Sequence, residues 1–244
     1  MYRWLLHQPK TMGVQERRQR EKETRWKQIL AAAKDLFVTK GYEGTSIEMI
    51  ASKLELSKRT IYLYFDSKDE LYYAVAKQGM QIMADMFSKA ASEDGNGLFR
   101  FANIGVAYAG FWDKHPDYRR IMNNLASIET VKPSGLHGKE FEEINLEIME
   151  TMVGTIEQGI KDGSIREDVD PLVAAFCISS SMQGVLQNLD RRENELRAMG
   201  KPRKRVIFET LDLFGKALAS PGQDCRLILE TMNREMKDEG GKIK

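Results

Sequence analysis

The sequence predicts an all-α fold, in which a head of three short helices joins a larger helical body through one long helix. Apolar residues recur at the three-to-four residue spacing of amphipathic helices through most of the 244 residues. No segment shows the polar and apolar alternation of a half-buried strand, and no internal repeat is visible. Because 42% of the residues are hydrophobic, the chain can bury a core without a disulfide or metal.

The head is expected within residues 23–68. Its first helix carries an apolar face from Trp26 to Phe37, and Gly41 is a plausible C-terminal cap. Residues 1–22 are polar and charged beyond their first few positions, and we expect a mobile basic arm there. Its closely spaced cations are Arg17, Arg18, Arg20 and Lys22.

Two short helices follow, at about 47–54 and 58–64. Thr45 and Ser46 precede the first and Ser57 precedes the second, all of them residues that can cap a helix N-terminus. About three residues separate the pair, which is helix-turn-helix spacing. A fourth, long helix begins near Ser67 and runs to about residue 91.

The body is expected over residues 69–237, followed by a tail at 238–244. The stretch 92–97 is an acidic loop, and it lacks the ligand spacing and closing Glu of a calcium loop. Proline and glycine mark the other breaks. Helices are expected at roughly 98–114, 117–127, 138–162, 171–190, 204–219 and 222–237.

Charge is divided unevenly between head and body. Residues 1–77 hold 15 basic and 10 acidic side chains, and the remainder hold 22 and 26. A basic front on an acidic body predicts a polyanion-binding head. The uncharged stretch 171–189 contains serine, glutamine and asparagine, so a buried helix is favoured over a membrane span. With no signal-peptide core at the start, a cytoplasmic location is expected.

Catalytic and metal-binding signatures are missing from the sequence. There is no GxSxG, no phosphate-binding glycine loop and no HExxH. The three histidines, His7, His115 and His137, lie far apart, with no acidic or cysteine neighbour at ligand spacing. Cys177 and Cys225 show no CxxC spacing and are expected to be small buried hydrophobes. We therefore expect no enzyme, no metal and no cofactor.

A dense set of motif positions lies between residues 24 and 72: Leu36-Phe37, Gly41-Tyr42, Thr45-Ser46-Ile47, Ile50-Ala51, Ser57, Thr60-Ile61-Tyr62, Tyr64-Phe65, Lys68-Asp69 and Leu71. With these residues the segment resembles the TetR family of transcriptional regulators. The resemblance implies a DNA-binding head, a long linking helix, and a homodimer that reads a palindromic operator. It also implies release from DNA, most simply as a repressor, when a small molecule enters the body.

One position departs from the family pattern. The turn reads Leu54-Glu55-Leu56-Ser57 where the family usually has a glycine. A residue with a Cβ in a left-handed turn costs about 1–2 kcal/mol. Either the turn is reshaped or the strain is tolerated.

The resemblance assigns DNA contacts to two groups of residues. The expected groove-facing or base-contacting residues are Lys58, Arg59, Thr60 and Tyr62, and the expected phosphate contacts are Thr45, Ser57, Tyr64 and Lys68. Tyr62 could instead pack in the core, and Arg59 could be a solvated surface charge. Ile61 and Phe65 are assigned to the core.

Two predicted helices of the body carry matching apolar rows that could close a four-helix bundle between subunits. The rows are Ile178, Met182, Val185 and Leu189, and Ile207, Leu211, Phe214 and Leu218. The alternative is that these rows pack only within their own subunit.

A ligand pocket is expected among the helices at 98–190. Its candidate lining residues are Phe101, Tyr108, Phe111, Trp112, Met122, Met149, Met152 and Phe176. Each could instead be ordinary core. A row of acidic residues could bind a cation, although a solvated helix face is favoured: Glu140, Glu142, Glu143, Glu147 and Glu150. The alternative function is a helical protein-binding adaptor without ligand control, which would not bind DNA in a salt-dependent way.

Overall fold

The computed structural model describes residues 13–127 and 135–223. Within these ranges the chain is helical, with one isolated bridge between Ile165 and Ala219 as the only β pairing, which confirms the all-α prediction. The predicted helix at 222–237, apart from its first two positions, and the tail at 238–244 lie outside the described residues. The helices are α1 (Val14–Lys40), α2 (Ile47–Lys53), α3 (Lys58–Tyr62), α4 (Lys68–Ala91), α5 (Gly97–Lys114), α6 (Pro116–Ser127), α7 (Gly135–Lys161), α8 (Pro171–Ala198) and α9 (Arg203–Leu218).

Helix α1 begins about three turns before the predicted start near Trp26. The expectation of a mobile arm is therefore wrong for residues 14–22. Pairs of side chains stabilise these exposed turns in place of an apolar face: Arg17 bonds to Glu21 at 3.0 Å, and Gln19 bonds to Glu23 at 3.1 Å. The first-turn Glu16 accepts a hydrogen bond from the backbone N–H of Gly13.

The core of the head extends past the predicted boundary at residue 68. Ile29, Ile50 and Ile61 of the first three helices are fully buried. The same cluster includes the first half of α4, from Leu71 to Ala76, and Ile121 of α6. Head and body are therefore continuous through α4.

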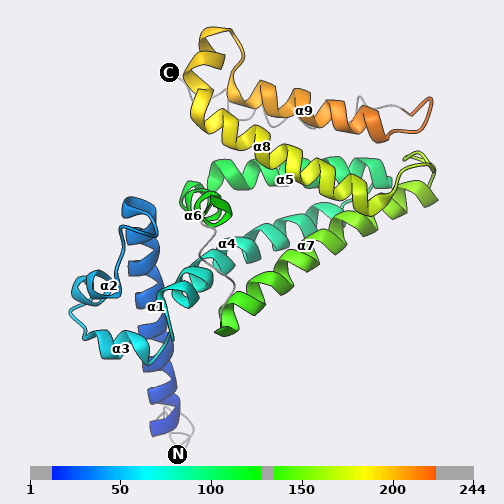
Figure 1. Ribbon diagram of the computed structural model, residues 1–244. Helices are drawn as coiled ribbons and strands as arrows, with labels where there is room; N and C mark the ends of the chain where they lie inside the picture. The colour runs from blue at the N-terminus through cyan, green and yellow to red at the C-terminus, as the bar shows by residue number, and fades with distance from the viewer. Residues whose placement is uncertain (1–12, 128–134, 224–244) are drawn as a thin grey trace, which may run out of the picture.

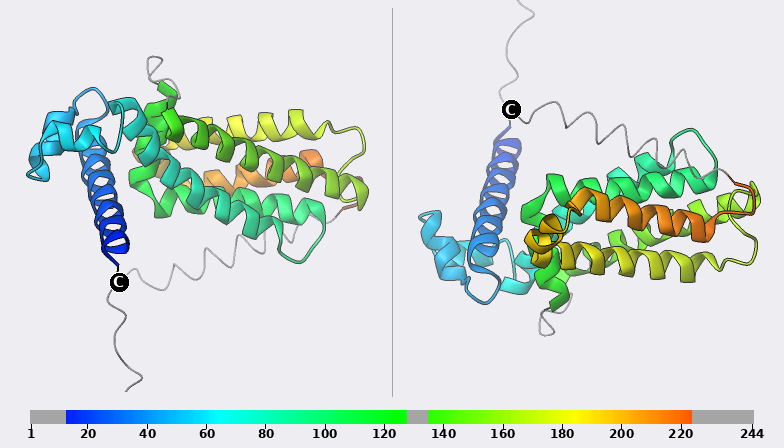
Figure 2. Two further views of the ribbon diagram at one scale, coloured as in Figure 1. Left: turned by 90° about the horizontal axis from the view of Figure 1, so that it is seen from below. Right: turned by 90° about the horizontal axis from the view of Figure 1, so that it is seen from above.

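The body is a bundle built around α4 and α7, which pack against each other along much of their length. Helix α5 packs against both of them, and α8 and α9 lie side by side, with α8 against α7 and α9 against α5 (Figures 1 and 2). The turn after α7 anchors the start of α5, because Asp162 accepts from the N–H of Gly97 at 2.8 Å and Ser164 from that of Leu98 at 3.1 Å.

Helix α8 continues to Ala198, beyond the predicted end at 190, with a non-helical residue at Arg192. Arg203 at the start of α9 bonds to Asp113 of α5 and Asp190 of α8. Among the described helices, α8 alone has the length and apolar composition of a membrane span, and 22% of its most apolar window is buried in the subunit. The uncharged part of α8 is thus less buried than expected.

Candidate nucleic-acid interface and body cavity

The two helices after α1 form a helix-turn-helix whose starts are capped as predicted. The Ser46 side chain accepts from the N–H of Met49 at 3.3 Å, and Ser57 accepts from the N–H of Thr60 at 3.1 Å. The N–H of Leu56 bonds to the carbonyl of Ala51 at 2.9 Å and closes the turn between them. These bonds fix α3 against α2.

The turn uses a left-handed residue that is not glycine. Glu55 has φ of 55°, the one such non-glycine residue in the described chain. Of the two alternatives posed by the sequence, the left-handed turn is kept and its strain is tolerated. The Glu55 side chain is exposed, so the strain is confined to the backbone.

Helix α3 presents an open face. Lys58 and Arg59 are exposed, and Tyr62 keeps 50% of its surface accessible. Tyr62 therefore does not pack in the core, whereas Ile61 and Phe65 are buried as predicted. Two cations and a half-exposed phenol on one short helix can contact base edges and phosphates in a major groove. Leu63, which sequence reasoning missed, adds an exposed apolar side chain next to Tyr62.

An ion pair on the same face engages Lys58. Its ammonium bonds to the carboxylate of Glu48 on α2. The hydrogen bond from Lys58 lowers the pKa of Glu48 to about 2, and the same bond raises the pKa of Lys58. Glu48 thus stays ionised at neutral pH and places a negative charge beside the exposed cations of α3.

Two of the residues predicted to contact phosphates form hydrogen bonds within the head instead. Thr45 is 2% exposed, and its hydroxyl donates to the carbonyls of Leu36 and Gly41. This corrects the expectation for its side chain, which is committed to the loop after α1. Lys68 donates to the carbonyls of Tyr42 and Thr45 at 3.0 and 3.2 Å, so at most one of its N–H groups is left for a phosphate.

The head is joined to the body by contacts beyond the α4 helix. The Tyr72 hydroxyl donates to the carbonyl of Ile121 on α6 at 2.9 Å. The His137 ring, in the first turn of α7, lies 6.2 Å from Trp26 and 5.8 Å from Phe65, measured between ring centroids. These contacts make the first turns of α7 a support for the segment that follows α3.

His137 also has an acidic partner, contrary to the expectation from the sequence. Its Nδ1 lies 2.8 Å from Glu140, which in turn bonds to Lys77 of α4 at 2.6 Å. Glu140 is therefore part of the junction between α4 and α7 and not of a solvated face. Among the described residues no three His, Cys, Asp or Glu side chains gather as metal ligands.

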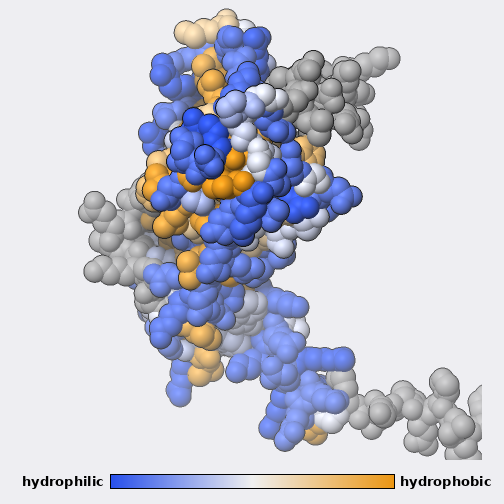
Figure 3. Space-filling model, turned by 90° about the vertical axis from the view of Figure 1, so that its right-hand side faces the viewer, coloured by the Kyte–Doolittle hydropathy of each residue, from blue (hydrophilic) through white to orange (hydrophobic). Residues whose placement is uncertain are grey.

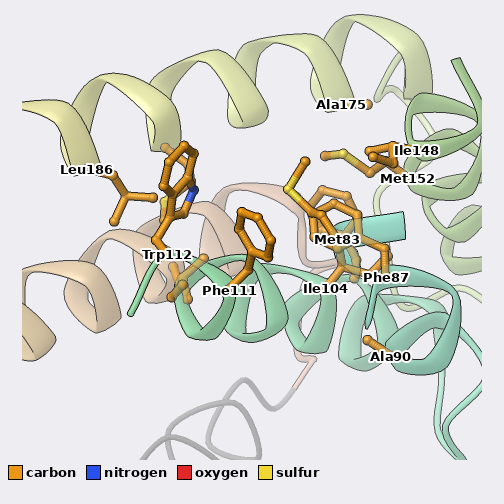
Figure 4. Close-up of a cluster of buried hydrophobic side chains, with 14 of the residues drawn as sticks. Met83, Phe87, Ala90, Ile104, Phe111, Trp112, Ile148, Met152, Ala175 and Leu186 are labelled. Atoms are coloured by element: carbon orange, nitrogen blue, oxygen red, sulfur yellow. The ribbon is translucent and has the colours of Figure 1, made fainter. Parts of the chain in front are cut away.

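The body contains a partly open cavity of about 440 Å³ between α4, α5, α6, α7, α8 and α9. Seven of the eight predicted residues line it; the eighth, Phe111, is fully buried and does not line it. Met83 and Phe87 of α4 and Met152 of α7 lie in the same interior layer as Trp112 (Figure 4). Lining residues outside the predicted pocket set include Tyr73, Met80, Leu98, Asn145, Ile148, Ser179 and Gln183.

The cavity wall carries no charged side chain among the described residues. Its polar groups are neutral and come from Tyr108, Asn145, Ser179, Ser180 and Gln183. Burial raises the pKa of Tyr108 to about 12, against a smaller opposing effect of the Trp112 indole, so the phenol stays protonated. The indole N–H of Trp112 itself makes no hydrogen bond of normal geometry. The cavity suits an uncharged, mainly apolar molecule.

Helices α8 and α9 carry an apolar face that no element between residues 13 and 127 or 135 and 223 covers. Leu172, Val173, Phe176 and Leu213 are each more than half exposed, and Cys177 beside them is exposed and not buried as expected. Apolar surface shows over the body, whereas the head end is mainly hydrophilic (Figure 3). Five residues of the predicted subunit contact face inward instead, which corrects their assignment: Met182, Leu189, Ile207, Leu211 and Leu218.

Comparison with known proteins matches the head to a family model. Residues 29–75 match the model described as "Bacterial regulatory proteins, tetR family". The repressor AcnR of Corynebacterium jeikeium is 25% identical over 80% of this chain and 92% of its own length. The regulator RutR of Escherichia coli is 41% identical over 30% of this chain and 33% of its own.

Solved structures share the fold over most of the chain. FadR of Bacillus subtilis in complex with stearoyl-CoA aligns with a TM-score of 0.62 at 17% identity, over 78% of this chain and 97% of that one. The capped helix-turn-helix with its exposed cationic helix, set on an all-helical body, defines a DNA-binding transcriptional regulator. Residues 29–75 match the DNA-binding domain of the TetR family, and the chain is similar over most of its length to regulators of that family. Its relatives are regulators of transcription, so a protein-binding adaptor is not supported.

Proposed function

We propose that the chain is a homodimeric repressor that binds a palindromic operator and leaves it when an uncharged, mainly apolar molecule fills the body cavity. Ligand control is supported by one observation: two side chains belong both to the wall of the cavity and to the edge of the head core. Tyr73 of α4 and Phe141 of α7 both line the cavity, and both pack at the edge of the head core. Their rings meet edge to face at 5.4 Å.

The route from the cavity to α3 is short. Phe141 lies one turn after His137, whose ring contacts Trp26 and Phe65. Phe65 follows the end of α3 by three residues. A ligand that displaces Phe141 therefore shifts the first turn of α7 and the support beneath α3. Met83 and Phe87 of α4 also line the cavity, whereas Met86 lines a separate groove with α5 and α9.

The side chains that line the cavity indicate the chemical class of the effector. An ionised carboxylate or ammonium inside the cavity would lie without a charged partner, which is costly in an apolar site. A neutral hydroxyl or ester can bond to the amides of Asn145 and Gln183 or to the serines of α8.

The proposed dimer uses the exposed face of α8 and α9. Leu172, Phe176 and Leu213 would be buried against the same helices of a second subunit, and such isologous contacts give two-fold symmetry. Two-fold symmetry in turn matches a palindromic operator. A DNA-binding role also agrees with a cytoplasmic location.

A head-group series tests the proposal. Dodecanol, dodecanoate and dodecylammonium share one chain and differ in charge, so thermal unfolding should show stabilisation by the alcohol and little by the two ions. The alcohol should then lower operator affinity, and operator DNA should weaken alcohol binding by the same factor. His137→Ala should keep both binding events and lose the coupling, whereas the control Leu146→Ala, exposed on the same helix, should keep it. Equal stabilisation by all three, with no change in operator affinity, would contradict ligand control.

A further inference from the structure

The first turns of α1 carry a row of cations on the side of the helix that turns toward the rest of the head. Arg18, Lys22 and Arg25 precede Ile29 at intervals of four, three and four residues. These intervals place the four side chains along one line of a helix. Ile29 is fully buried in the head core, as is Ala33 one turn further on. This side of α1 is therefore apolar where it packs in the head core and cationic in the turns before the core.

The ring stack of the head shows how far this row extends past α3. Trp26, the residue after Arg25, stacks on Phe65 with ring centroids 6.3 Å apart. At a rise of about 1.5 Å per residue, Arg18 lies about 12 Å beyond Trp26 along the helix axis. Figure 1 shows the N-terminal end of α1 running past α3 on the side away from the body. The row therefore extends the head beyond the recognition helix.

The three cations carry charge that the described chain does not neutralise. Arg17 is paired with Glu21, but Arg18, Lys22 and Arg25 form no ion pair with any other residue between 13 and 127 or 135 and 223. Arg18 and Lys22 are exposed, and Arg25 is half-buried beside the head. Unpaired cations in a row near a DNA-reading helix attract backbone phosphates, which carry one charge per base pair on each strand.

We propose that Arg18, Lys22 and Arg25 bind the phosphate backbone of the operator outside the base pairs that α3 reads. The proposal rests on DNA reading by α3. An extension of about 12 Å corresponds to three or four phosphates at about 3.4 Å per base pair. Each half-site is then longer than the part whose sequence is read, and the added part contributes affinity with little sequence preference.

The test compares two double variants that remove the same charge from opposite sides of α1. Arg18→Ala with Lys22→Ala removes two cations of the row, and Arg20→Ala with Lys27→Ala removes two exposed cations that lie about half a turn away. Alanine favours helix in both, and circular dichroism checks that helix content is kept. Operator affinity is measured against salt by fluorescence anisotropy.

The row variant should lower operator affinity and flatten the salt slope by about four units per dimer, one for each lost contact, whereas the control should change the slope by less than one. Trimming four flanking base pairs from each operator end should weaken binding by the unchanged protein, and it should weaken binding by the row variant less, because that variant keeps only Arg25 of the row. The proposal would be overturned, without affecting DNA reading by α3, if the two double variants changed operator affinity and salt slope equally. It would also be overturned if trimming weakened the unchanged protein and the row variant equally. Absence of any specific operator binding by the unchanged protein would overturn DNA reading by α3 as well.

Discussion

Replacing Glu55 by glycine should stabilise the protein, although it removes a side chain. Glu55 holds φ of 55°, where a Cβ costs about 1–2 kcal/mol. Glycine relieves this cost, but it also gives the unfolded chain more freedom, which is worth about 0.4–1 kcal/mol in the opposite direction. Because the side chain is exposed, no packing is lost. The net gain is about 0.5–1 kcal/mol, or about 2 °C in melting temperature for a chain of this size.

Urea unfolding of Glu55→Gly and of the control Glu55→Ala measures this gain. The alanine variant loses the carboxylate and keeps the Cβ, so its stability should stay within about 0.5 kcal/mol of the unchanged protein. Both variants should keep the same m-value, which shows that the surface exposed on unfolding is unchanged. If glycine were no more stabilising than alanine, the turn would not be strained and the reasoning from its backbone angle would be refuted.

Two further predictions concern the α3 face and the subunit contact. Glu48→Gln removes the carboxylate that binds Lys58, which leaves the Lys58 ammonium available for a phosphate. DNA affinity should therefore rise, and the salt slope should steepen by about one unit per subunit. Glu157→Gln in the body is the control and should change neither. Because the pKa of Glu48 is lowered to about 2 and that of Lys58 is raised, both groups stay charged between pH 5 and 8, and this pair should cause no change in the DNA affinity of the unchanged protein over that range. No gain in affinity for Glu48→Gln would mean that Glu48 does not hold Lys58 away from DNA. Phe176→Asp should give a folded monomer by light scattering, while Leu146→Asp should stay a dimer, and a dimer in both would move the contact elsewhere.

Helix positions in the head and body could be predicted because apolar spacing and caps determine them locally. Ser46, Ser57 and Ser67 each accept the N–H three residues on, as their sequence positions indicated. The start of α1 was missed because its first turns bury no apolar face and are stabilised by pairs such as Arg17 with Glu21. The end of α8 was missed for a similar reason, since 191–198 is largely exposed.

Contacts between elements could be predicted less well. An apolar row shows that a helix is buried on one side, but not by which neighbour, so Met182 and Leu211 were assigned to a partner subunit although they pack within their own. Thr45 matches the family motif, yet its hydroxyl is bound inside the loop after α1. His137 became informative only when the fold brought it to Trp26 and Phe65, which precede it by more than seventy residues.

The central claim is that the exposed face of α3 reads DNA sequence, and the most direct test is the specificity of Arg59→Ala. Two duplexes are compared: a palindromic operator from the DNA upstream of the gene that encodes this chain, and a scrambled sequence. The affinities of the unchanged protein and of Arg59→Ala for each duplex are measured at one salt concentration. The unchanged protein should prefer the operator, and Arg59→Ala should lose about 1–3 kcal/mol of that preference, a factor of about 5 to 150, with little change on scrambled DNA. An equal loss of affinity for both duplexes, with the preference intact, would contradict base reading by this face.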